Sequence, residues 1–139
     1  MKNVVIKSVF FAFIAILGSS VFFSLKAQSK AVTPKVYAVI NKADWCTVCK
    51  ANGARVMNEI IPACKELNVK FVPNDLTDAT TSAKSAADLK KEKIFNSVKK
   101  TKATGIILLV DAKSKKVIKE ISVTKPTKEI IEEITAAQS

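Results

Sequence analysis

Two cysteines separated by two residues, Cys46 and Cys49, are the side chains of this sequence best suited to chemistry. They follow an apolar, β-rich run at Val36–Ile40 and stand at the start of a helical pattern. At the first turn of a helix, Cys46 would face unpaired backbone N–H groups and the positive end of the helix dipole. Both features favour the thiolate, which is the attacking species in disulfide exchange.

The spacing of the pair predicts a disulfide that forms and breaks reversibly. Cys49 lies one helical turn beyond Cys46, so the two sulfurs can be joined. We expect an exposed Cys46 to attack and a more shielded Cys49 to resolve the mixed disulfide. Lys42 and Lys50 would help to stabilise the thiolate, whereas Asp44 would oppose it.

Composition excludes most other chemistry. The chain has no histidine, which removes Ser–His–Asp and Cys–His catalysis, histidine-bearing zinc sites and CxxCH haem attachment. We expect no cofactor and no resident metal. The formal net charge of +11 comes almost wholly from scattered lysines, with Arg55 as the only arginine. No aromatic residues interleave these lysines, so we expect no nucleic-acid partner.

Hydrophobic periodicity predicts the elements that position the cysteines. Strands are expected at Val36–Ile40, Val69–Pro73, Ile106–Val110 and Val117–Val123. Helices are expected from Cys46 to a kink or end near Pro62, from Asp78 or Ser82 to about Lys93, and from Pro126 onward. The order β-α-β-α-β-β-α predicts an α/β fold of three layers, with a mixed central sheet and helices on both faces. The first two crossovers are expected to be parallel and the last pair antiparallel.

The third cysteine is predicted to be structural. An apolar stripe on the first helix comprises Val56, Met57, Ile60, Ile61, Cys64 and Leu67. On a continuous helix, Cys64 would lie about 27 Å along the axis from Cys46, far beyond the reach of a disulfide. We therefore expect a buried thiol at Cys64.

The beginning of the chain is predicted to direct its export. Met1–Lys7 is short and basic, Ser8–Leu25 has no charged residue, and small residues follow. This order predicts a signal peptide over residues 1–29, with cleavage after Ala27 or Ser29. The apolar run could instead remain as an uncleaved membrane anchor. In either case we expect residues 30–139 to form one periplasmic or secreted domain, in a compartment where disulfides persist.

The run Trp45-Cys46-Thr47-Val48-Cys49-Lys50, placed between a strand and a helix, resembles the Trp-Cys-x-x-Cys-Lys signature of the thioredoxin superfamily. The resemblance covers about residues 32–137 and implies a thioredoxin-like fold. It implies a thiol–disulfide oxidoreductase, and the export signal points to the secreted or periplasmic members of the family. We expect a monomer that acts on protein thiols and disulfides, with an unidentified redox donor. Cys46 would be its nucleophile, Cys49 its resolving cysteine and Trp45 the indole that shields the site. Lys50 completes the signature.

Two positions depart from the family's pattern. Thr104-Gly105 stands where the family places a cis-proline that faces the disulfide, and glycine permits close approach without fixing a cis bond. We expect Thr104 and Gly105 to support the site, although Gly105 could equally be only a glycine at the entry of a strand. Ile40 stands where many thioredoxins carry a buried carboxylate that assists the resolving thiol.

Two other functions remain open for the same cysteines. Without a shielding proline, Cys46 and Cys49 could hold a soft ion such as Cu(I). They could also form a static disulfide within a binding domain. Metal analysis of the reduced protein and a reductase assay distinguish these functions from disulfide exchange.

Overall fold

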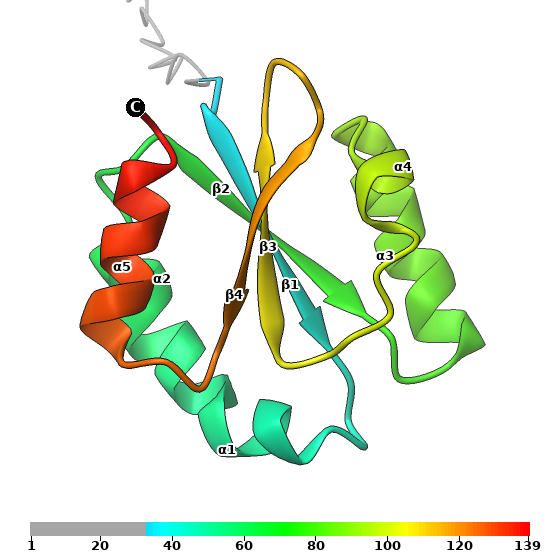
Figure 1. Ribbon diagram of the computed structural model, residues 1–139. Helices are drawn as coiled ribbons and strands as arrows, with labels where there is room; N and C mark the ends of the chain where they lie inside the picture. Colours follow the sequence, from blue (N-terminus) through cyan, green and yellow to red (C-terminus); the bar gives the residue numbers. More distant parts are fainter. Residues whose placement is uncertain (1–32) are drawn as a thin grey trace, which may run out of the picture. The chain divides into compact units, whose positions relative to one another are not determined.

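The computed structural model describes residues 33–139, so the predicted signal peptide or anchor at residues 1–29 lies outside the described residues. In this part of the chain, no helix is both long and apolar enough to cross a membrane. Helical and strand segments follow one another in the predicted order β-α-β-α-β-β-α (Figure 1).

A mixed sheet of four strands forms the centre of the described domain. The strands are β1 (Val36–Lys42), β2 (Val69–Asp75), β3 (Ile106–Asp111) and β4 (Val117–Ser122), and their spatial order is β2-β1-β3-β4. β1 pairs with β2 in parallel, whereas β3 is antiparallel to both β1 and β4. The predicted mixed sheet is therefore confirmed, and the apolar strand β3 lies in its interior.

The prediction of two parallel crossovers is wrong for the second one. Helix α3 (Ala79–Lys91) carries the chain away from the end of β2, and α4 (Phe95–Val98) follows it. Residues 99–105 then run back along the sheet without helix or strand, so β3 begins at the end where β2 finishes (Figure 1). This additional pass reverses the direction of β3. Hydrophobic periodicity does not reveal it, because the segment has no period of its own.

The helix that follows β1 is divided into three parts. An α-helical segment, α1 (Thr47–Arg55), passes into the π-helical η1 (Val56–Ile60) and a final turn, α2 (Ile61–Ala63). The N–H of Ile61 donates to the carbonyl of Val56, five residues earlier. The departure from α-helical geometry therefore lies in the turn before Pro62, where a proline removes a hydrogen bond and crowds the carbonyl four residues earlier.

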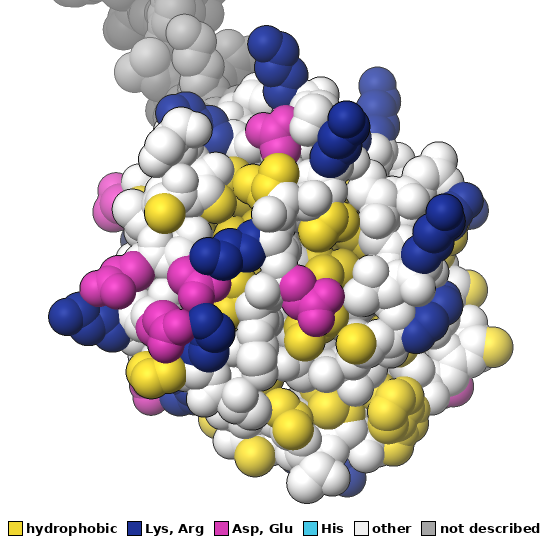
Figure 2. Space-filling model, in the orientation of Figure 1, with side chains coloured by type: hydrophobic (Ala, Val, Ile, Leu, Met, Phe, Trp, Pro, Cys, Tyr) yellow, Lys and Arg dark blue, Asp and Glu magenta, His cyan; other side chains and the backbone are white. Residues whose placement is uncertain are grey.

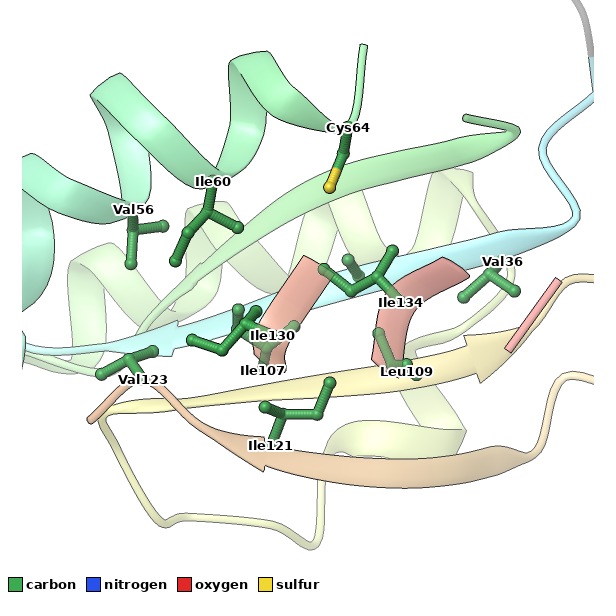
Figure 3. Close-up of a cluster of buried hydrophobic side chains, with 11 residues drawn as sticks. Val36, Val56, Ile60, Cys64, Ile107, Leu109, Ile121, Val123, Ile130 and Ile134 are labelled. Carbon is green, nitrogen blue, oxygen red and sulfur yellow. The ribbon is translucent and has the colours of Figure 1, made fainter. Parts of the chain in front are cut away.

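Apolar side chains from the two faces of the sheet form two core clusters. One cluster joins alternate residues of β1 and β3 to η1 and to α5 (Thr127–Ala136), as Figure 3 shows for residues that include Val56, Ile60, Ile130 and Ile134. The other cluster joins the intervening strand residues to α3 and α4. The predicted helices on both faces are thus confirmed.

Individual predictions for the helices have different outcomes. Asp78 caps α3 by accepting a hydrogen bond from the N–H of Thr81, as expected for an N-cap. Cys64 is buried in the first cluster, and burial raises the pKa of its thiol. Its prediction as a core thiol is confirmed.

Met57 is 61% exposed, so its predicted place on the buried stripe is wrong. The π-helical segment changes the angular spacing on which that prediction depended.

Candidate active site

Cys46 and Cys49 form a disulfide at the amino end of α1, with their Cα atoms 5.2 Å apart. Cys46 is the N-cap residue of α1, and its Sγ accepts a hydrogen bond of 3.1 Å from the N–H of Cys49. The sulfur therefore lies at the positive end of the helix dipole and beside a backbone donor. Both would stabilise a thiolate on Cys46 once the disulfide is reduced.

The exposure of the two cysteines is the reverse of the expected order. Cys46 is only 7% exposed, whereas Cys49 is half-buried. The expectation of an exposed Cys46 and a shielded Cys49 is therefore wrong for the disulfide form. The reason is tertiary, because the loop before β3 covers Cys46 and α1 has no buried residue that would press Cys49 into the core.

Gly105 is the residue of that loop which approaches the disulfide. It adopts φ of +75°, a conformation that favours glycine. A Cβ at this position would lie 2.8 Å from Cγ1 of Val48 and 3.7 Å from Sγ of Cys46. Both the backbone conformation and the lack of space therefore require glycine. The structure thus brings Gly105 of the predicted supporting pair to the disulfide, and this close approach goes beyond the needs of strand entry.

Asn41 holds this loop in place, and the sequence analysis did not identify it. Its side chain is fully buried, and Nδ2 donates to the carbonyl oxygens of Thr101 and Ala103 at 3.2 and 3.0 Å. Its backbone carbonyl accepts the N–H of Gly105 at 2.9 Å. Its Oδ1 accepts from Nδ2 of Asn74, its partner across β1 and β2. Asn41 directly follows the predicted strand Val36–Ile40, and the structure extends β1 to include it. A polar residue that continues an apolar strand is the signal that could have indicated this role.

Trp45 is held at the surface beside the cysteines. Its side chain is 62% exposed, and Nε1 donates to the carbonyl of Thr77 at 3.1 Å. The hydroxyl of Thr77 also accepts the N–H of Asp44 at 2.9 Å. These contacts fasten the turn before Cys46 to the loop after β2. Thr77 is thus a second positioning residue that sequence reasoning missed.

Lys42, expected to help stabilise the thiolate, instead forms an ion pair with Asp75. Burial raises the pKa of Asp75, but hydrogen bonds from Lys42 and Thr77 outweigh that effect and lower the pKa to about 2. The positive charge of Lys42 is therefore largely compensated beside the site. Lys50, the other expected cation, is exposed on α1.

Arg55 fastens the far end of α1 to the connection between β4 and α5. Its guanidinium donates to the carbonyls of Val123 and Lys125 and to Oγ1 of Thr127. The guanidinium of the chain's only arginine therefore donates to several acceptors at once. A lysine ammonium cannot reproduce this forked arrangement of donors.

Ile40, at the position where many thioredoxins carry a carboxylate, packs against the first core cluster. Within residues 33–139, no three His, Cys, Asp or Glu side chains are grouped so that they could hold a metal ion.

No family model, curated protein or solved structure matches this chain. The geometry of the cysteine pair is consequently the basis on which a function can be assigned.

Proposed function

We propose that this protein is an exported thiol–disulfide oxidoreductase of the thioredoxin superfamily, which exchanges disulfides with protein partners through Cys46 and Cys49. One observation carries the proposal: the two sulfurs are bonded at the amino end of a helix, where Sγ of Cys46 accepts a backbone hydrogen bond. A thiolate at this position is stabilised and is therefore both a reactive nucleophile and a good leaving group.

The surroundings of the pair support the assignment to the superfamily. The disulfide lies directly after a buried strand, and the antiparallel strands β3 and β4 with helix α5 follow in the order that the resemblance implies. Gly105 meets Cys46 from the loop before β3, which is the place of the family's cis-proline. In this protein the backbone of Gly105, rather than a proline ring, would approach the disulfide, which would distinguish it from the family's usual pattern.

Exchange would proceed in two displacements. In the reduced protein, the Cys46 thiolate attacks a sulfur of a client disulfide and the other client sulfur leaves as a thiolate. Cys49 then attacks Sγ of Cys46 in the mixed disulfide, which releases the second client sulfur and restores the internal bridge. Two electrons pass from the protein to the client, and an external thiol donor must supply them again.

The proposal places this chemistry in the periplasm or outside the cell. The signal-like segment at residues 1–29 supports export, and the partners would be protein thiols and disulfides met by a monomeric domain.

The direct test is reduction of a disulfide-bonded protein such as insulin by dithiothreitol, with and without the full-length chain. Cys46→Ser should lower the catalysed rate at least about 100-fold, because no thiolate remains to attack. Cys64→Ala is the matched control, since it removes a cysteine that lies in the core, and should keep the rate within about twofold.

Alkylation of the reduced protein provides a second measurement. One thiol, Cys46, should react fast and with a pKa below that of a free cysteine. Equal and slow labelling of Cys46 and Cys49 would contradict the proposal. Equilibration with glutathione or dithiothreitol would then give the midpoint, and a bridge that resists both reagents would indicate a static disulfide instead.

A further inference from the structure

A cavity of about 610 Å³ lies between α1 and the sheet, and Cys49 forms part of its wall. Apolar side chains that line it include Ile40, Val56, Pro73 and Val123. Helix α1 does not fill this space, because it has no buried residue and a Cβ placed on Gly53 would have no atom within 4 Å. The volume is within the range of small-molecule sites, roughly 300–1,000 Å³.

The charges at the cavity favour an uncharged occupant. Lys42 is paired with Asp75, and the two other charged residues of the lining, Asp44 and Lys50, have opposite signs. The charges in and beside the lining therefore cancel, and no excess charge remains to select an ionic ligand. Apolar surface is also exposed nearby at Trp45 and Met57, and hydrophobic side chains gather at the lower end of Figure 2. Burial of an apolar group is the interaction that this lining can offer.

The two cysteines of the disulfide differ in their position relative to the cavity. Cys49 is in the wall, whereas Cys46 is 7% exposed and is not part of the lining. They also differ as leaving groups, because Sγ of Cys46 accepts the N–H of Cys49 at the amino end of α1. A thiol with a lower pKa leaves faster in disulfide exchange. Attack on Cys49 with departure of Cys46 therefore combines the cysteine that lines the cavity with the better leaving group.

We propose that the cavity binds small apolar thiols and presents them to Sγ of Cys49, so that they reduce the disulfide. This inference rests on the proposed redox function of the pair and names a reductant class for it. The bound thiolate forms a bond to Sγ of Cys49, the Cys46–Cys49 bond breaks, and its electron pair remains on Cys46 as a thiolate. A second molecule of the thiol, as its thiolate, attacks the sulfur of the first, releases Cys49 and forms the small-molecule disulfide.

Benzyl mercaptan and glutathione are suitable probes, because one is apolar and the other charged. Each should be reacted with the oxidised full-length protein and with the oxidised peptide 45–50, which has the same disulfide and no cavity. The ratio of the benzyl mercaptan rate to the glutathione rate should be at least about tenfold higher for the protein. After quenching with N-ethylmaleimide, mass spectrometry should find the benzylthio group on Cys49 and the maleimide on Cys46.

Two leucine variants on α1 test the role of the cavity itself. Gly53→Leu places a side chain in the empty space and should lower the rate ratio to that of the peptide. Ala51→Leu adds the same side chain at an exposed position of the same helix and should keep the ratio of the unaltered protein. A ratio equal to that of the peptide in the unaltered protein, or a benzylthio group on Cys46, would overturn the proposal.

The outcomes separate this inference from the proposed function. If the protein reduces insulin but does not prefer benzyl mercaptan, the cavity proposal alone fails. If benzyl mercaptan is preferred while protein disulfides are not turned over, the cavity proposal stands and the proposed activity on proteins fails.

Discussion

Helices α1 and α5 are anchored to the rest of the domain by different interactions. In α5, Ile130 and Ile134 are both fully buried in the first core cluster. In α1, no residue is buried, and the helix continues into η1, where Val56 and Ile60 enter that cluster. The cysteine pair therefore stands at the start of a helix that contributes no buried side chain of its own to the core.

Polar contacts take the place of apolar packing around α1. Arg55 fastens one end of the helix to the residues after β4, and Thr77 fastens the turn that precedes its other end. Asn41 holds the loop that covers Cys46. Burial therefore fixes the fold, whereas a small number of directed hydrogen bonds fixes the site and leaves space beneath it.

The largest expected effect tests the apolar side of this comparison. Ile134→Ala removes a fully buried side chain and should lower the free energy of unfolding by about 3 kcal/mol. Met57→Ala removes a side chain of similar size that is 61% exposed, and should cost less than about 1 kcal/mol. Urea unfolding monitored by far-UV circular dichroism measures both. Met57 lies in η1, which continues α1, so equal losses would show that the exposed side of this helix is packed as tightly as α5.

Asn41 should have the next largest effect. Asn41→Ala leaves the carbonyls of Thr101 and Ala103 and the amide of Asn74 without their partner, and should lower the free energy of unfolding by about 2 kcal/mol. The freed loop should also raise the rate at which reagents reach Cys46. Asn74→Ala is the control: it removes only the contact with Oδ1 and should leave alkylation of reduced Cys46 unchanged. A faster reaction in both variants would contradict the specific role of Asn41.

Arg55→Lys should loosen α1 while leaving α5 intact. The lysine keeps the charge but cannot supply the forked donors to Val123, Lys125 and Thr127, so the opening free energy of α1 should fall by about 1–2 kcal/mol. Native-state hydrogen exchange measures the amides of the two helices separately. Comparable acceleration in α5 would indicate a global loss of stability and contradict a local tether.

The smallest expected effect is a loss of stability at acidic pH, which arises from Asp75 beside the site. The pKa of Asp75 falls from its ordinary value of 3.8 to about 2 in the folded protein, because hydrogen bonds from Lys42 and Thr77 outweigh burial. Its contribution to stability is therefore complete above about pH 4 and lost as the pH falls toward 2. Thermal unfolding across this range should show a loss of about 1 kcal/mol, which Asp75→Asn should remove. An unchanged acid limb in that variant would contradict the assignment.

The sequence by itself determined the elements, the mixed sheet and the position of the cysteine pair. Hydrophobic periods report which residues face the core, and the strand-to-helix change at Cys46 placed its sulfur at a helix end. Tertiary structure alone decided the direction of β3, because residues 99–105 have no period that predicts their path.

Tertiary structure also decided the exposure of the two cysteines and the roles of Asn41 and Thr77. These depend on which loops meet around α1, and contacts between distant segments leave no regular spacing in the sequence. The hydrogen bonds from Asn41 to the loop before β3 join residues that are 60 or more positions apart in the sequence. They form only after the sheet has brought these segments together.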